Sequence, residues 1–398
     1  MSHGAPTRID AAAYDGRALS SLIGIGAGLG VVGLGAGLTF GGGAQFSFSW
    51  LVAYLYWLSI ALGSMFFVLC LAITRAGWGV TARRMSENVM ATLPLFAVLF
   101  IPIWLGRHEL YEWTDPEVVA KSRALAGKAA FLNEGFFFAR AVIYFVAWSA
   151  IATYFSTQSQ QQDQTGDERV SARLRLLSAP GLMVFALTST FAAIDWMMSL
   201  EPEWYSTMIG VYYYAGAVVG SFAFLVLLIQ FARARGALQG VVTIEHLHDI
   251  GKLMFGFVIF WTYIAFSQYF LIWYANVPEE TVHYVHRQVG SWGSLGAFLA
   301  FGHFLVPFFF LMPRAVKRQP ALLGLAAVWL LVMHYLDLYW SVMPILHPDG
   351  VRFCASDVAA FCGVGGFFLA AIGWVASRRA LVPLRDPRLP ESLSFENV

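Results

Sequence analysis

Residues 48–73 read FSWLVAYLYWLSIALGSMFFVLCLAI, and this stretch contains no Asp, Glu, Lys or Arg. A helix needs roughly 20 consecutive, mostly apolar residues to cross the hydrocarbon core of a bilayer. The stretch is therefore long enough and apolar enough to span a membrane as one helix. Similar stretches recur along most of the chain, so this pattern decides the fold class.

The composition of the whole chain agrees with this prediction. Of 398 residues, 58% are hydrophobic and 12% are charged, whereas a soluble domain has about 25% charged residues. This balance excludes a soluble globular enzyme, a nucleic-acid-binding protein and a disordered chain. The net charge of +1 creates no overall field that would attract a nucleic acid.

Ten apolar runs predict ten transmembrane helices joined by short connections. The fold class that we expect is an all-α polytopic membrane protein, with two four-helix bundles (spans 2–5 and 6–9) and two peripheral helices. The longest connection, about 106–132, is expected to form a small surface helix. The predicted spans are residues 19–40, 48–73, 87–105, 133–157, 176–196, 207–231, 248–273, 287–312, 321–340 and 356–377.

The distribution of Lys and Arg predicts the orientation. Most of the 25 basic residues fall on the side of the N-terminus, and Arg140 falls inside a span. Cytoplasmic loops of membrane proteins are enriched in Lys and Arg, so both termini are expected in the cytoplasm. The first span has no convincing cleavage site and is interpreted as a helix. The basic residues on the opposite side are Arg107, Lys121, Arg123, Lys128, Arg287 and Arg352.

Two spans end in the same pattern, which indicates an internal repeat. Asp195-x3-Ser-x2-Pro closes the fifth span and Asp337-x3-Ser-x2-Pro closes the ninth. The second and sixth spans share Tyr-x6-Gly-Ser, beginning at Tyr56 and Tyr213. Four spans restore the same orientation, so the units would be parallel repeats. The predicted divisions are 1–47 (N-terminus and first span), 48–206 and 207–344 (the two bundles), and 345–398 (last span and tail).

Two familiar cofactor patterns are set aside. Residues 28–33 spell GxGxxG, but they lie inside an apolar helix, where Gly24/Gly28, Gly26/Gly30 and Gly33/Gly37 are better interpreted as helix-packing pairs. His303 and His334 are predicted about 24 Å and about 9 Å from the same membrane surface, too different in depth to share a haem. The chain also has only three cysteines. We expect no cofactor bound covalently or by metal ligation.

Ionisable residues inside spans are costly and mark functional sites. Those near helix ends, Glu87, Glu134, His248 and Asp249, are better explained by snorkelling or capping, and Arg140 is interpreted mainly as a structural partner of an acid. The resulting candidates for a proton pathway form two layers: Arg140, Asp195, His334 and Asp337 on one side, and Asp249, Lys252 and His303 on the side of the termini.

These residues support two kinds of chemistry that the sequence does not separate. Acids and histidines in both membrane halves are typical of proton half-channels, because burial or pairing brings their pKa values near ambient pH. A quinone site needs an apolar cavity and a His or carboxylate that exchanges a proton, for which Asp195 and His334 are the candidates. A secondary transporter is a further alternative. Against it, we expect no Gly/Pro break in the middle of spans 2–9.

Two long strings resemble a known family. Residues 195–210, DWMMSLEPEWYSTMIG, and 248–281, HDIGKLMFGFVIFWTYIAFSQYFLIWYANVPEET, closely resemble the ActF-type membrane subunits of alternative complex III, which belong to the NrfD/PsrC-like integral membrane proteins. The resemblance covers most of the chain.

The resemblance implies a subunit of a bacterial quinol:electron-acceptor oxidoreductase in the inner membrane, not catalytic alone. The implied partners are a homologous ten-span subunit, which would be the main quinol-oxidising site, an iron–sulfur subunit, multihaem and monohaem cytochrome c subunits, small membrane subunits and the lipid bilayer. Its implied role is to support proton translocation coupled to quinol oxidation. In the alternative, in which the chain binds a quinone, the ligands would be menaquinone or ubiquinone, together with lipids.

Overall fold

The computed structural model describes residues 14–397, and this part of the chain folds almost entirely into helices. Within it the only β-type pairing is an isolated bridge between Asp15 and Ala380. The α-helices are α1 (Ser21–Phe40), α2 (Gly43–Ile73), α3 (Val80–Met90), α4 (Leu93–Leu99), α5 (Ile101–Leu105), α6 (Arg107–Leu110), α7 (Pro116–Lys121), α8 (Arg123–Lys128), α9 (Glu134–Thr165), α10 (Glu168–Trp196), α11 (Ile209–Ala234), α12 (Ile244–Ala275), α13 (Pro278–His286), α14 (Ser291–Leu299), α15 (Val306–Leu311), α16 (Arg314–Arg318), α17 (Pro320–Val342), α18 (Ala355–Ala376) and α19 (Leu389–Leu393).

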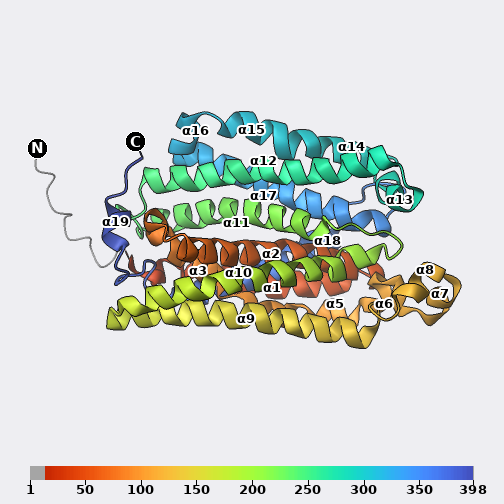
Figure 1. The fold of residues 1–398 in the computed structure, drawn as a ribbon, viewed down its shortest axis with the longest axis horizontal. Coiled ribbons are helices and arrows are strands. Elements are labelled where there is room, and N and C mark those ends of the chain that lie inside the picture. The colour runs from red at the N-terminus through yellow and green to blue at the C-terminus, as the bar shows by residue number, and fades with distance from the viewer. Residues whose placement is uncertain (1–13, 398) are drawn as a thin grey trace, which may run out of the picture.

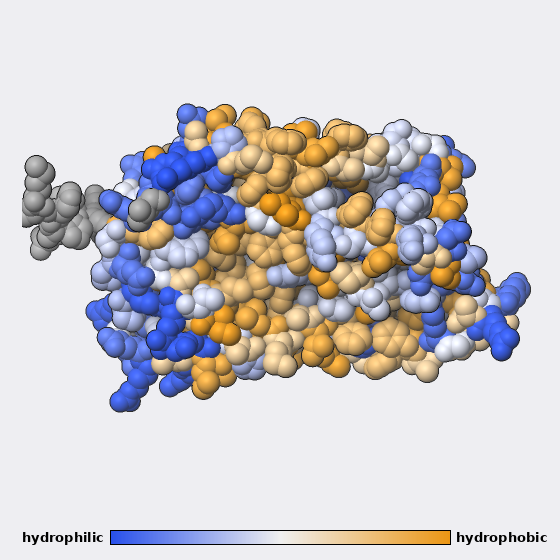
Figure 2. All heavy atoms as spheres, turned by 45° about the horizontal axis from the view of Figure 1, so that its top comes forward, coloured by the Kyte–Doolittle hydropathy of each residue, from blue (hydrophilic) through white to orange (hydrophobic). Residues whose placement is uncertain are grey.

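Ten helical segments are long and apolar enough to cross a membrane, which confirms the predicted fold class. Their axes lie side by side, with α16 and α19 at one end of the molecule and α7, α8 and α13 at the other (Figure 1). We call these the α19 end and the α13 end. An apolar band separates two hydrophilic ends (Figure 2), as expected for a protein that exposes its middle to lipid.

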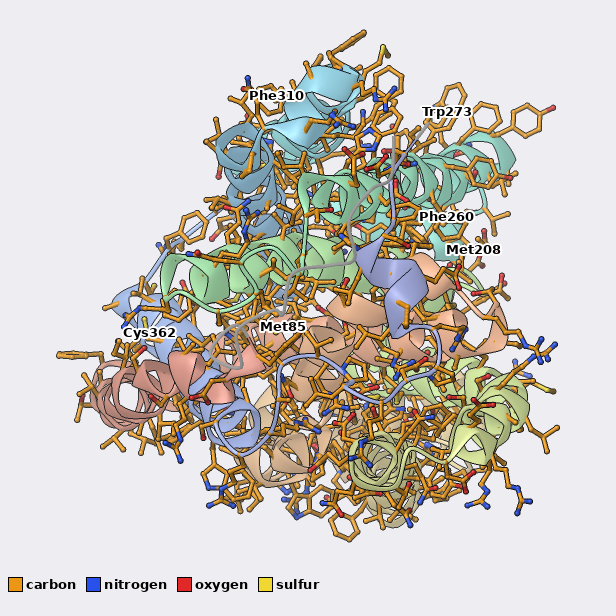
Figure 3. The ribbon with its side chains drawn as sticks, turned by 90° about the vertical axis from the view of Figure 1, so that its left-hand side faces the viewer. Met85, Met208, Phe260, Trp273, Phe310 and Cys362 are labelled. Carbon is orange, nitrogen blue, oxygen red and sulfur yellow. The ribbon has the colours of Figure 1, made fainter. Side chains whose placement is uncertain are left out.

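Helices α2 and α11 form the centre of the molecule. Each is buried along most of its length, and they pack against each other. Helices α3, α10 and α18 pack on α2, while α12 and α17 pack on α11. The end-on view places Met85 of α3 near the middle and Trp273 of α12 at the margin (Figure 3).

The repeated Gly-Ser pairs meet where α2 crosses α11. The Ser64 and Ser221 hydroxyls lie 2.9 Å apart. A Cβ added to Gly63 would meet the Ala217 carbonyl oxygen at 2.4 Å, so the close crossing requires glycine there. The repeated motif therefore has a packing role in both helices.

Glycines also allow α1 to pack tightly on α18. A Cβ at Gly26 would lie 2.6 Å from the Gly366 carbonyl oxygen, and one at Gly33 would lie 2.3 Å from the Gly363 nitrogen. The expected packing role holds for these positions. Gly24 and Gly28, by contrast, have nothing within 4 Å of an added Cβ, so this pair does not pack against the described part of the chain.

Two spans are less regular than the sequence predicts. The third begins at Gly77, earlier than expected, and is divided into α3, α4 and α5. The eighth contains a π-helical segment, η6 (Ala300–Leu305), which ends two residues before Pro307. The span nevertheless runs as one continuous helix from Ser291 to Leu311, so the wide turn is an irregularity within the helix and no break in it.

Helices α9 and α10 extend beyond the predicted spans at the α19 end. Polar contacts stabilise the extra turns: Gln162 donates to the Ser171 hydroxyl at 2.7 Å, and Asp163 pairs with Arg84 at 2.7 Å. Hydropathy does not detect such turns, because their stabilising contacts are polar. The predicted surface helix between the third and fourth spans forms as the short segments α6, α7 and α8.

Candidate functional site

Asp195, near the end of α10, is enclosed by donors from α9. The Arg140 guanidinium donates to both carboxylate oxygens, each at 2.8 Å, and the Tyr144 hydroxyl donates at 2.7 Å. The residue is fully buried. A two-pronged arginine contact is among the stronger pairings for a carboxylate, so Asp195 is neutralised by a partner as we expected for Arg140.

Aromatic rings fill the space around this pair. Trp196 packs against Tyr144, Phe145 and Trp148, with ring centroids within 6 Å of its own. Asp195 does not line the large cavity described below. The first bundle is thus closed at this position.

Asp337, at the matching position of α17, has different partners. The Tyr212 hydroxyl on α11 donates to one carboxylate oxygen, and the Trp261 indole nitrogen on α12 donates to the other at 3.2 Å. Within residues 14–397, no basic side chain forms a salt bridge with Asp337, although it is 2% exposed. The repeat therefore places one paired and one unpaired carboxylate at equivalent positions.

A cavity of about 840 Å³ lies beside Asp337. Three of the residues that line it, Tyr263, Phe266 and Phe301, are more than half exposed, so the cavity opens sideways between α12 and η6. Its volume falls within the range of small-molecule sites, about 300–1,000 Å³. The lining is mainly aromatic and aliphatic, and its polar members are Thr262, Gln268, Tyr212, Tyr263, Tyr269, His283, Tyr284, Arg287, Gln288, Asp337 and Ser341.

Polar groups line the cavity at two places. One is the Asp337–Tyr212 pair, with Ser341 one turn further along α17. The other lies toward α13, where the Gln268 amide donates to the Tyr284 hydroxyl at 3.2 Å. A ligand with an apolar body and polar groups on its ring could contact both places.

His303 is linked to Asp337 through Trp261. Its ring stacks on Trp261 with centroids 3.8 Å apart, and Trp261 is the donor to Asp337. The assignment of His303 to the layer on the side of the termini stays a prediction. Among the described residues, neither ring nitrogen has a hydrogen-bond partner, although the side chain is fully buried.

The π-helical turn itself is held by α17. It leaves the Gly302 carbonyl free to accept a hydrogen bond from the Trp329 indole nitrogen at 2.6 Å. His334, also on α17, faces the centre instead, where its Nε2 lies 2.8 Å from the Ser59 hydroxyl of α2. His334 does not line the cavity.

Asp249 and Lys252 lie far along α12 from this site, at the α19 end. They form a salt bridge of 2.5 Å, and the Lys252 ammonium also donates to Asn397 at 3.2 Å. The structure thus brings together Asp337, His303 and His334, but not these two residues.

An ionic network at the α19 end is more extensive than the sequence indicates. Arg83 bridges Glu87 at 3.0 Å and Asp386 at 2.8 Å, and Arg84 bridges Glu87 at 2.9 Å. The spacing of these residues on α3 gave a signal, because Arg83 and Glu87 are four residues apart. Their partner Asp386 lies 303 residues from Arg83, so no local sequence pattern indicates this contact.

A second missed cluster lies at the α13 end, outside the spans. Arg287 donates to both Glu201 carboxylate oxygens, at 3.1 and 3.0 Å, and His283 donates to Glu201 from Nδ1. Burial disfavours the charged carboxylate, but Arg287 and His283 outweigh it and lower the pKa of Glu201. Burial and Arg287 lower the pKa of His283 to about 4, so at neutral pH the pair is an ionised acid and a neutral imidazole.

The fold and the site define a class: an all-α, ten-span membrane protein with a lateral apolar cavity beside a buried carboxylate. Comparison with protein-family models and with curated proteins gives no match. In the described part of the chain, no group of three or more His, Cys, Asp or Glu side chains is placed to hold a metal ion.

Proposed function

We propose that this chain is a membrane subunit of a quinol:electron-acceptor oxidoreductase of the alternative complex III type, and that its second bundle binds a quinone. The observation that supports the proposal most is the cavity beside Asp337. The resemblance of residues 195–210 and 248–281 to ActF-type subunits supports the choice of complex.

A quinone suits the chemistry of the cavity. Its flat ring would pack among the aromatic side chains, and its isoprenoid tail would leave through the opening between α12 and η6. Its carbonyl oxygens would accept hydrogen bonds, one of them from the Tyr212 hydroxyl once that proton turns from Asp337 to the ligand. Asp337 would exchange the proton that accompanies oxidation or reduction of the ring. Menaquinone and ubiquinone both fit this description.

The two bundles would have different roles. In the first, Arg140 neutralises Asp195 and aromatic rings occupy the surrounding space. In the second, the carboxylate has only neutral donors and borders the cavity. We therefore assign ligand binding to Asp337 in place of the original candidates Asp195 and His334.

Electrons would pass through other subunits. In this proposal an iron–sulfur subunit and the cytochrome c subunits supply the redox centres, and the homologous ten-span subunit contributes the main site of quinol oxidation. The complex would lie in the bacterial inner membrane with both termini of this chain in the cytoplasm, which places the α13 end on the periplasmic side.

Ligand binding is tested with the full-length chain in lipid nanodiscs, titrated with a short-chain naphthoquinone. Binding is followed by quenching of tryptophan fluorescence, since Trp204, Trp261 and Trp340 line the cavity. In a parallel titration with the reduced form, the naphthoquinol, whose hydroxyl can donate to the Asp337 carboxylate, we expect Asp337→Asn to weaken binding about 10-fold through loss of a charged hydrogen-bond partner. Asp249→Asn, at the other end, is the control. Equal affinity in all three proteins, or no saturable binding, contradicts the proposal.

A second candidate function is proton translocation. Polar side chains of α2 lie between the two ends of the molecule: Ser59 contacts His334 at 2.8 Å, and Ser64 contacts Ser221 at 2.9 Å. The buried network of Glu87 lies toward the α19 end. These groups could support proton transfer through intervening water between that network and Asp337.

Proton translocation is tested on the whole complex in liposomes. We expect Asp337→Asn, and Asp195→Asn if it assembles, to lower the number of protons moved per electron, while Glu203→Gln leaves it unchanged. A wild-type ratio in the Asp337 variant contradicts a role for this residue in the pathway.

A further inference from the structure

Helix α13 has its polar side chains on the face toward the protein. His283 and Arg287 are buried, and Tyr284 lies between them on the same face. The opposite face presents Val282 and Val285, which are 44% and 55% exposed. An amphipathic helix on a water-soluble surface has the reverse arrangement.

The outer side of α13 is itself divided. Glu279 and His286 are exposed beside the valines, on the edge of the helix next to them. The helix thus has a polar face toward the protein, an apolar face, and a charged edge. Such a division fits a helix that lies at the boundary between acyl chains and headgroups, with its apolar face toward the acyl chains.

Neighbouring residues favour lipid as the occupant of the apolar face. Trp273 and Tyr274, at the end of α12 just before α13, are 62% and 76% exposed, and Trp273 lies at the margin of the end-on view (Figure 3). Trp and Tyr are enriched at membrane interfaces. Along α12 the exposed aromatic surface continues to Phe266, beside the cavity opening.

The inner face of α13 forms part of the cavity wall. His283, Tyr284 and Arg287 line the cavity, and His283 stacks on Trp204 with ring centroids 3.8 Å apart. Across this wall, Glu201 is the acidic partner of both His283 and Arg287. This contact joins α13 to the segment that follows α10.

The two ends of α13 differ in how they are anchored. Arg287 also donates to the carbonyl oxygens of Trp340 and Ser341, at 3.2 and 2.6 Å, which fixes the end that leads into α14. The other end follows Asn276, which adopts a left-handed conformation at φ 48°. Between the two ends, within one turn of Arg287, Glu201 accepts a hydrogen bond from His283 and the Gln268 amide donates to the Tyr284 hydroxyl, and these contacts hold the inner face of α13 closed.

We propose that α13 is a lipid-embedded gate to the cavity, with its valine face in the outer boundary of the bilayer and its inner face closed by Glu201. Opening moves the inner face of α13, at His283, away from Trp204, while Arg287 stays attached to the carbonyl oxygens of α17. A ligand dissolved in the membrane would then reach the polar end of the cavity from the lipid side. That this ligand is a quinone rests on the proposed function, whereas the gate itself does not depend on it.

The lipid contact is tested with a fluorophore attached to a cysteine at position 285 or at position 279. The background replaces Cys70, Cys354 and Cys362 with serine. In vesicles of phosphatidylcholine containing brominated acyl chains, we expect Val285→Cys to be quenched at least about twofold more than Glu279→Cys. Equal and weak quenching at both positions overturns the lipid contact. Loss of quenching at position 285 in the assembled complex means that a partner subunit covers this face, which also overturns it.

The gate is tested by access to Ser341, which lines the cavity. In the same background, Ser341→Cys is labelled with a membrane-permeant maleimide in vesicles. We expect Glu201→Gln to raise the labelling rate about 10-fold, because the neutral amide no longer accepts a charge-assisted hydrogen bond from His283. Glu203→Gln, two residues away and exposed, is the matched control. Glu201→Asp keeps the charge and should raise the rate less.

The outcomes separate the gate from the proposed function. An unchanged labelling rate in a folded Glu201→Gln protein overturns the gate, even if the naphthoquinone binds. Faster labelling without any naphthoquinone binding supports the gate and contradicts the ligand. If Glu201→Gln does not fold, His283→Asn takes its place. This variant removes the contact of Glu201 with His283 and keeps the contact with Arg287, and it should still raise the labelling rate above that of Glu203→Gln.

Discussion

Asp195 and Asp337 occupy matching positions in two repeated segments, yet Arg140 pairs with the first, while a phenol and an indole are the donors to the second. The difference arises in the helices that pack against each acid. Helix α9 supplies an arginine to Asp195, and α11 and α12 supply a tyrosine and a tryptophan to Asp337. One position is consequently closed, while the other borders a cavity.

The two acids should respond differently to neutralisation. Asp195→Asn leaves the Arg140 guanidinium buried without a counter-charge, which typically costs about 3–5 kcal/mol. Asp337→Asn leaves no buried cation, so its free energy of unfolding should stay within about 1 kcal/mol of wild type. Unfolding by SDS titration in mixed micelles measures both values. Equal losses in the two variants would mean that the paired and unpaired environments are not as described.

Removing both partners of the first acid should recover stability. Arg140→Met alone leaves Asp195 buried as an unpaired carboxylate and should cost about 3–5 kcal/mol. Arg140→Met with Asp195→Asn removes both charges, so the double variant should be more stable than either single one. The same SDS titration measures this coupling. Additive losses would show that the two side chains do not act as a pair.

The tail that follows α18 should depend on the ionised form of Asp386. Burial disfavours its charge, but Arg83 and neighbouring donors outweigh burial and lower the pKa of Asp386. A lowered pKa stabilises the docked tail above the ordinary pKa of an aspartate, and this stabilisation is lost as pH falls through the lowered value. Docking should therefore be constant from pH 8 to pH 5.

Hydrogen exchange of residues 381–397 measures this docking. We expect Asp386→Asn to increase exchange in this segment at pH 7, while Asp349→Asn, an exposed acid at the α13 end, does not. An increase in wild-type exchange between pH 8 and pH 5 would contradict the assigned protonation state.

The contact between α13 and Glu201 should likewise be insensitive to pH near neutrality. The lowered pKa of Glu201 keeps the acid ionised, and the pKa of His283, about 4, keeps the ring neutral. The other ionisable groups facing the contact are Arg287, which is a permanent cation, and His286, at 3.4 Å. We expect the labelling rate at position 341, corrected for maleimide reactivity, to be constant between pH 6 and pH 8. A several-fold change in that range would show that His283 titrates there.

The fold was predictable because spanning helices depend on local composition. All ten spans could be found from apolar runs such as residues 48–73. The π-helical turn in the eighth span was missed, because it lies in an ordinary apolar run and no local pattern indicates the hydrogen bond from Trp329 to Gly302. The division of the chain into repeats at residue 206 stays a prediction.

The site was predictable only in part. The motif around Asp195 and Asp337 identified both acids, but their partners come from other helices and no local pattern names them. Tyr212 and Trp261 look like ordinary aromatic residues of a span. Glu201 and Arg287 are 86 residues apart, and their pairing depends on how α13 folds back over the cavity.

The central claim is that a quinone-like ligand occupies the cavity beside Asp337. The most direct measurement is photoaffinity labelling of the full-length chain in nanodiscs with an azido-naphthoquinone, followed by mass spectrometry of the peptides. We predict labels in residues 261–268 and 337–341, lost on competition with the unmodified naphthoquinone. Competable labels confined to the helices around Asp195, or labels that competition does not reduce, would contradict the claim.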